Sequence, residues 1–291
     1  MKIRDRIWLW GQDVMSHHQV GPRKENIWNL PGINRMDPAE GARFLGIRNI
    51  CRVVMNGSPE PPFDGEMEKL AGCDRVIWSV LGDSGSDRPG DVQDDLEELL
   101  ALARRYPNLK GGILDDFFRP LSAQWATDQM ARLPLERVRT IKARLHSAEP
   151  SLELWIVIYE SALSEYYRSY LAECDAVTFW TWHGEHLDDL AGNLSRVFEL
   201  SPGKKHLAGC YAYDYGNCRP LAPERMRKQC SVYADYLKRD LLQGVIICSN
   251  CIADIGLKEI DYLRGWIAEI GDETVIPADE EALPETKNVS A

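Results

Sequence analysis

Carboxylates follow several apolar runs of this chain at positions where they could perform acid–base chemistry. The clearest case is the run Gly111–Leu114, which ends directly in Asp115 and Asp116. An apolar run that ends in two acids is typical of a buried strand that delivers carboxylates to a pocket. Other apolar runs end in polar clusters in the same way, and the candidate catalytic residues at such positions are Asp115, Asp116, Glu160, Glu185 and Asp214. The pattern predicts an enzyme whose polar groups gather at one face of a parallel sheet.

Aromatic and amide residues at the same positions indicate a carbohydrate ligand. The CH faces of a sugar stack on indole and phenol rings, and its hydroxyls bond to acid and amide groups. We expect Trp182 and Tyr213, which are nearest to their strand ends, to provide the stacking platform, and most other tryptophans to pack in the core. The expected substrate-binding residues are Trp10, Gln12, Tyr159, Trp182, His183, Tyr213 and Asn250.

Glycosidic cleavage requires one protonated carboxyl group as general acid and one carboxylate as nucleophile or base. Alternation along a strand sends only one of Asp115 and Asp116 directly inward, and we predict that it is Asp116. In the alternative interpretation, these aspartates and Glu160 cap helices or form loop ion pairs, and Glu185 belongs to a solvated loop. The assignment of acid and base, and the stereochemical outcome, stay open.

A second group of residues has the chemistry of metal ligands. His183, Glu185 and His186, together with Asp115 or Asp116, would supply nitrogen and oxygen ligands, as in metal-dependent sugar isomerases or epimerases on a barrel fold. However, the order His-x-Glu-His matches neither common zinc helix motif and falls in a predicted loop. We therefore predict no metal and no cofactor. The isomerase and a non-catalytic carbohydrate-binding barrel are kept as alternatives.

Strand-like runs alternate eight times with segments of helical period. The predicted strands lie near residues 6–12, 49–56, 75–82, 109–116, 152–159, 176–182, 206–213 and 243–250. The predicted helices lie near residues 37–46, 63–72, 91–106, 122–147, 162–173, 187–199, 222–241 and 257–270. Eight strand–helix pairs predict an α/β fold, a single (β/α)8 TIM barrel over residues 1–271, because the first strand lacks the glycine-rich turn of an open dinucleotide-binding sheet. Residues 272–291 are acidic, contain two prolines and are expected to form a flexible tail.

Composition limits the possible partners. The formal net charge of −11 argues against nucleic acid, which proteins bind mainly through Lys and Arg. No apolar run reaches the roughly 18 to 20 residues that cross a bilayer, and no signal peptide is recognisable, so we expect a cytoplasmic protein without a membrane partner. The eight cysteines are then expected as free thiols. The expected partner is a small carbohydrate, and the oligomeric state stays open.

The order of elements and the segment Gly112–Phe117 resemble the glycoside-hydrolase-type barrels. The resemblance covers residues 1–270 as architecture and the fourth strand alone as a motif. On the DxxDxDxE pattern of chitinase-like members, Asp116 matches the last aspartate, but Phe118 stands in place of the catalytic glutamate. Families with an aspartate nucleophile on the fourth strand and an acid on the sixth imply those roles for Asp116 and Glu185. Two further segments, residues 179–182 and 211–216, are similar to those of uncharacterised bacterial barrel proteins.

Overall fold

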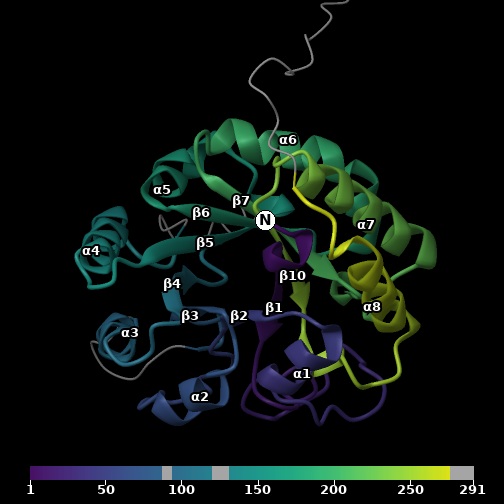
Figure 1. Ribbon diagram of the computed structural model, residues 1–291, viewed down its shortest axis with the longest axis horizontal. Helices are drawn as coiled ribbons and strands as arrows, with labels where there is room; N and C mark the ends of the chain where they lie inside the picture. Colours follow the sequence, from purple (N-terminus) through teal and green to yellow (C-terminus); the bar gives the residue numbers. More distant parts are fainter. Residues whose placement is uncertain (87–93, 120–130, 276–291) are drawn as a thin grey trace, which may run out of the picture.

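Eight parallel strands close into a barrel in the computed structural model, which describes residues 1–86, 94–119 and 131–275 (Figure 1). Around the barrel the strands follow the order β1, β10, β7, β6, β5, β4, β3, β2, and all neighbours pair in parallel. The barrel strands are β1 (Ile7–Gly11), β2 (Asn49–Arg52), β3 (Arg75–Leu81), β4 (Leu109–Leu114), β5 (Glu153–Tyr159), β6 (Ala176–Trp180), β7 (Lys205–Tyr211) and β10 (Gly244–Cys248). The predicted (β/α)8 barrel is therefore confirmed.

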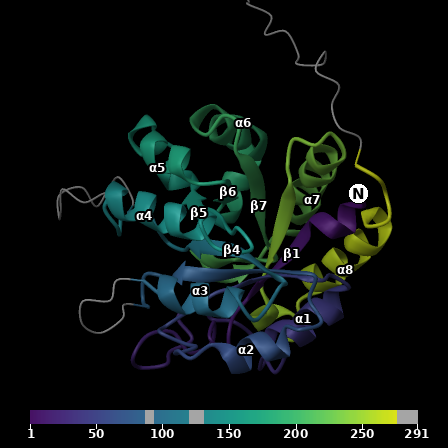
Figure 2. The ribbon, with the colours of Figure 1, turned by 60° about the vertical axis from the view of Figure 1, so that its left-hand side comes forward.

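A helix follows each barrel strand, and together the helices surround the barrel (Figures 1 and 2). Their apolar faces pack on the strands, as in α3, where Leu96 and Leu99 are buried while Glu97 and Glu98 are exposed. The helices are α1 (Pro38–Leu45), α2 (Asp64–Lys69), α3 (Leu96–Ala103), α4 (Leu135–His146), α5 (Arg168–Glu173), α6 (Leu190–Leu200), α7 (Pro223–Lys238) and α8 (Lys258–Ile270). The predicted helix near 122–147 begins in residues 120–130, which lie outside the described residues.

Two of the predicted helices are shorter than expected because 3-10 turns precede them. The turns η3 (Glu160–Ala162) and η4 (Glu165–Tyr167) come before α5, and η5 (Gly184–Asp189) comes before α6. A small antiparallel pair, β8 (Tyr213–Asp214) and β9 (Arg219–Pro220), flanks the turn η6 (Tyr215–Asn217) after β7. The predicted strand near 206–213 therefore breaks at Ala212, and the residues after this break belong to a separate loop hairpin.

Indole rings fill the interior of the barrel. Trp8 of β1 meets Trp155 of β5 with ring centroids 4.9 Å apart, and Trp10 meets Trp180 of β6 at the same distance. Because β1 and β5 lie on opposite sides of the barrel, the first pair spans its axis. Gly209 of β7 leaves room for the second pair, since a Cβ there would lie 1.9 Å from the Trp180 ring. The interior is thus packed, and the site must lie above these rings, at the carboxyl ends of the strands.

Both ends of the described chain meet at the amino-terminal face of the barrel. The turn η1 (Ile3–Arg6) receives the segment after α8: Ile3 donates its N–H to the Glu273 carbonyl at 2.9 Å, and Lys2 pairs with Asp272 at 2.9 Å. In the first residues of the expected tail, 272–274 are exposed and Val275 is buried. The remainder of the tail, residues 276–291, lies outside the described residues.

Two further features of the described chain bear on the predictions. All eight cysteines are free thiols, as expected. Within residues 1–86, 94–119 and 131–275, no helix combines the length and the apolar character that crossing a bilayer requires.

Candidate active site

The end of β4 directs its two aspartates to different places. A Cβ on Gly112 would contact side chains of α3 and α4, so this residue faces the helices. Alternation then turns Gly111, Ile113 and Asp115 towards the barrel interior. Asp115 is 4% exposed, whereas Asp116 is half-buried. The inward group is therefore Asp115, and the prediction that Asp116 points inward was wrong.

Asp116 leaves the strand because its backbone turns into the left-handed region, with φ of 43°. Aspartate tolerates this conformation better than most residues. The turn keeps the carboxylate at the rim, where its Oδ1 accepts a hydrogen bond from the Tyr159 hydroxyl at 2.9 Å. Its Oδ2 accepts bonds from the backbone N–H and the hydroxyl of Ser84, both at 3.2 Å. The loop after β3 and the last residue of β5 thus hold one carboxylate through three donors.

Asp115 keeps its proton at a pH where an exposed aspartate is ionised. Burial raises the pKa of Asp115 well above its ordinary value, and the negative charges of Asp116 and Asp83 act in the same direction. Two interactions oppose the rise: the Asp116 N–H donates to Asp115 Oδ1 at 2.8 Å, and the Arg132 guanidinium is nearby. Burial dominates, because an ionised carboxylate loses its water shell inside the barrel.

Five rings form an aromatic cluster at the same face: Trp28, Tyr159, Trp182, Tyr211 and Tyr215. The Trp182 ring stacks on Tyr215 with centroids 5.6 Å apart and an interplanar angle of 27°. The other three rings meet Trp182 edge-on at 6.1 to 6.2 Å. Trp182 is half-buried and so keeps part of its surface available to a ligand. Trp28 was not among the predicted binding residues, since it lies in the long loop between β1 and α1, where no periodic pattern marks it.

His17 supports this cluster from the same loop. Its Nδ1 lies 2.7 Å from the Tyr215 hydroxyl, and its ring is edge-on to Trp28 at 5.3 Å. Burial lowers the pKa of His17 to about 3, with a smaller contribution from His18. His17 is therefore neutral at ordinary pH and binds Tyr215 as an uncharged partner.

Tyr213 has a different role from the predicted stacking platform. It is 1% exposed, and its hydroxyl donates to the carbonyls of Trp28 at 2.8 Å and Asn29 at 3.2 Å. Tyr213 therefore anchors the loop that carries Trp28, and its ring offers no surface to a sugar. Tyr213 is buried because the chain turns after β7 and places this side chain beneath the loop between β1 and α1.

Glu160, His183 and His186 lie together between the ends of β5 and β6. Both carboxylate oxygens of Glu160 accept the Trp182 N–H, at 3.0 and 3.1 Å, and Oε1 lies 2.9 Å from His186 Nδ1. His183 Nδ1 lies 4.0 Å from the same oxygen. The side chain of Glu160 is 11% exposed, whereas those of the histidines are 39% and 48% exposed. The predicted grouping of the histidines with Glu185 is corrected, because Glu160 from the neighbouring strand takes that place.

Two predicted catalytic carboxylates instead hold the loop that follows β7. Asp214 is 3% exposed and accepts the N–H groups of Gly184 at 3.0 Å and Asn217 at 3.2 Å. Glu185 is exposed and accepts the Asn217 side-chain amide at 2.7 Å. These bonds give both carboxylates a structural role in the loop. The pairing of Asp116 with Glu185 as nucleophile and acid stays a prediction.

Three predicted binding residues lie beneath the rim. Asn250 is fully buried and bonds both the N–H and the carbonyl of Gln12, at 2.8 and 2.9 Å, so it fastens the end of β1 to the end of β10. Trp10 packs against Trp180 in the interior. Gln12 is 4% exposed, and its side-chain oxygen has no hydrogen-bond partner among the described residues. Asn250 and Trp10 therefore act in packing, while Gln12 stays a candidate.

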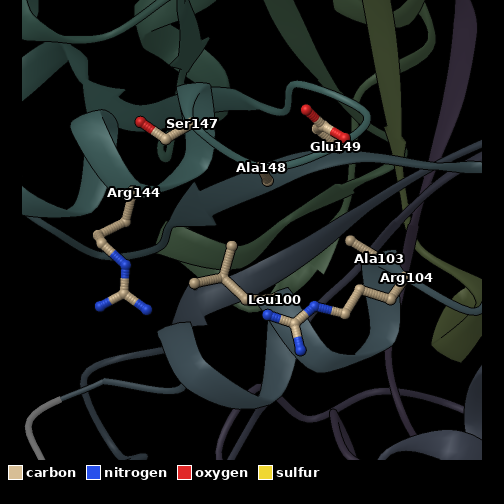
Figure 3. A pocket seen from close by; sticks show the side chains of 7 residues that line it. All are labelled: Leu100, Ala103, Arg104, Arg144, Ser147, Ala148 and Glu149. Atoms are coloured by element: carbon tan, nitrogen blue, oxygen red, sulfur yellow. The ribbon is translucent and has the colours of Figure 1, made fainter.

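A cavity of about 400 Å³ lies outside the barrel, between α3 and the end of α4 (Figure 3). Its lining includes Leu100, Ala103, Arg104, Arg144, Ser147 and Glu149. The lining comes from the second half of α3, the last turn of α4 and the residues just after each helix, where the chain returns to the start of the next strand. The cavity therefore lies towards the amino-terminal face, away from the strand-end carboxylates, and it is not the candidate active site.

The sequence matches no protein-family model and no curated protein. In structure the chain is similar to the C-terminal domain of Legionella pneumophila ChiA, at 11% identity and a TM-score of 0.53, over 93% of this chain and 100% of that one. It is also similar to a β-mannanase from the blue mussel Mytilus edulis, at 9% identity and a TM-score of 0.51, over 93% and 95% of the two chains.

A Bacteroides uniformis β-glucuronidase 2 mutant is similar at 13% identity and a TM-score of 0.51, over 86% of this chain. The chain spans only 31% of the length of that enzyme. Such low identities show the fold alone. These comparisons therefore show that the chain is a TIM barrel.

Proposed function

We propose that this protein hydrolyses a glycosidic bond in a small saccharide or glycoside, with Asp115 and Asp116 as its reactive carboxyl pair. The observation that carries the proposal is the contrast between these neighbours. One is buried, which raises its pKa well above the ordinary value, while the other lies at the rim and accepts three hydrogen bonds. Environments that give two neighbouring carboxyl groups different pKa values are characteristic of active sites that need an acid and a base together.

Each residue of the pair has a distinct part in the proposed reaction. Asp116 is the carboxylate that contacts the substrate: it attacks the anomeric carbon as nucleophile, or as base it deprotonates the water that attacks this carbon, while the glycosidic oxygen leaves with the proton of Asp115. The hydroxyls of Tyr159 and Ser84 orient it and stabilise its charge. Asp115 is the proton-bearing member of the pair, held in place by the Asp116 N–H.

The aromatic cluster supplies the binding surface in this proposal. Tyr159 belongs to both parts of the site, since its hydroxyl bonds Asp116 and its ring meets Trp182 edge-on. A sugar ring on Trp182 would therefore lie near the carboxylates. Stacking on an indole face leaves the sugar hydroxyls free for polar contacts. The barrel fold, which glycoside hydrolases such as β-mannanase share, is consistent with this arrangement.

The test is hydrolysis of a panel of aryl glycosides and short oligosaccharides by the purified chain and its variants. Asp116→Asn should lower kcat/KM about 100-fold or more, the usual contribution of one acid–base group. Trp182→Ala should mainly raise KM. Asp5→Asn, at an exposed aspartate of the amino-terminal turn, is the control and should leave both constants unchanged. Equal activities of Asp116→Asn and Asp5→Asn, or no turnover of any glycoside, would refute the proposal.

A further inference from the structure

We propose that Glu160, His183 and His186 form a binding site for one divalent transition-metal ion, with zinc as the representative ion. Each residue offers one ligand atom, and these three atoms lie within 4.8 Å of one another. The residues come from two neighbouring strand ends, β5 and β6, at the rim of the barrel. This site does not depend on the proposed hydrolysis, because it uses none of the residues assigned to that reaction.

The separations of the ligand atoms suit a metal ion. Zinc–nitrogen and zinc–oxygen bonds of roughly 2.0 to 2.1 Å place two ligands of a tetrahedral ion about 3.3 Å apart. The observed distances from Glu160 Oε1 are 2.9 Å to His186 Nδ1 and 4.0 Å to His183 Nδ1, which bracket that value. Both histidines are partly exposed, so small rotations of their rings bring all three atoms to the bonding distance.

Two backbone features orient these side chains before an ion binds. The Trp182 N–H bonds both oxygens of Glu160 and so fixes the carboxylate that would otherwise rotate. The His183 ring lies against Gly216, where a Cβ would come within 2.3 Å of the ring. Gly216 is itself tied to this region, since its N–H donates to the Trp182 carbonyl at 3.2 Å. Outer partners of this kind orient metal ligands and raise the affinity of a site.

The donor set selects the class of ion. Two imidazoles and one carboxylate suit zinc, manganese, iron, cobalt or nickel, whereas calcium and magnesium prefer oxygen ligands alone. Three protein ligands leave at least one position open for water or for an oxygen of a bound molecule. Since Trp182 adjoins the cluster, a hydroxyl of a bound polyol is the class of ligand that fits this open position.

Binding of Zn²⁺ alone to the full, tag-free chain after chelator treatment tests the proposal, by isothermal titration calorimetry. We expect one saturable site in the micromolar range or tighter. Loaded with Co²⁺, the chain should show visible absorption bands that depend on the same residues. Glu160→Gln and His186→Ala should each weaken binding at least about tenfold. His146→Ala is the matched control, because His146 also pairs with one carboxylate, Asp175 at 2.8 Å, with 43% of its side chain exposed.

Gly216→Ala tests whether the position of the His183 ring, and not only the presence of the three ligand residues, is needed for metal binding. It keeps all three ligands but displaces His183, so binding should weaken while circular dichroism shows a folded chain. Asp116→Asn should bind Zn²⁺ as the parent chain does, and the two proposals can therefore fail separately. Binding only at millimolar Zn²⁺, or affinity unchanged in Glu160→Gln and His186→Ala, would overturn the site.

Discussion

Replacing Asp115 with asparagine should make the protein progressively more stable than the parent chain as the pH rises above about 4. Asparagine has the size of a protonated aspartate and keeps an oxygen for the Asp116 N–H, which bonds Asp115 Oδ1 at 2.8 Å. It carries no charge at any pH. The variant therefore removes the one cost that the buried carboxyl imposes, its ionisation inside the barrel.

The sign and size of the effect follow from proton linkage. The folded state raises the pKa of Asp115, so between the unfolded value near 3.9 and the folded value the native chain binds more protons than the unfolded chain. The stability of the parent chain then falls by up to about 1.4 kcal/mol per pH unit in this range. For a chain of 291 residues this corresponds to about 2 °C of Tm per pH unit. Above the folded pKa the difference between the two proteins becomes constant.

The assay is urea unfolding of the parent chain, Asp115→Asn and the control Asp5→Asn at several pH values from 4 to 9. The difference between Asp115→Asn and the parent should grow with pH and then level off. The pH at which it levels off reports the folded pKa of Asp115. Asp5 is exposed, and this control reports how the removal of a surface carboxylate changes stability at each pH. A difference for Asp115→Asn that is independent of pH would show that Asp115 is not buried as described.

Two further predictions concern the stability of the same face and of the core. His17 has a folded pKa of about 3, so below its unfolded pKa near 6.5 the unfolded chain takes up a proton that the folded chain does not, and stability is lost as the pH falls towards 3. His17→Gln should lose less stability over this range in urea unfolding, and an unchanged acid slope would contradict a neutral, buried His17. Trp155→Ala should lower the free energy of unfolding by about 3 to 5 kcal/mol, because it removes the ring that meets Trp8 across the barrel axis. A loss below about 1 kcal/mol would show that the interior repacks.

Local sequence patterns were sufficient for the architecture. Strand-like and helical segments alternate because backbone geometry imposes periods of two and 3.6 residues on buried positions. The positions of the eight barrel strands, the face that carries the polar residues and the burial of Trp8 and Trp155 all follow from such short-range rules. Short-range rules did not decide which aspartate after β4 faces the barrel interior. Alternation allows only one of Asp115 and Asp116 to do so, and the choice follows from Gly112, which faces the helices because its neighbours there lie on α3 and α4.

The site itself depended on contacts between residues far apart in the chain. Glu160 joins His183 and His186 because neighbouring strands bring two loops together, a relation that no spacing within one loop reveals. The Trp28 ring contacts Trp182 from a loop whose sequence has no periodic pattern. The Tyr213 hydroxyl bonds the backbone of that loop, so Tyr213 stabilises the loop and is not a stacking surface.

The sequence by itself determined which elements form and at which face the chemistry gathers, because both follow from local periodicity and the common direction of the strands. Only the tertiary structure decided which carboxylates stay at the rim and which side chains bind the loops. That choice depends on loop conformation, which backbone turns such as the one at Asp116 and hydrogen bonds between distant segments set together.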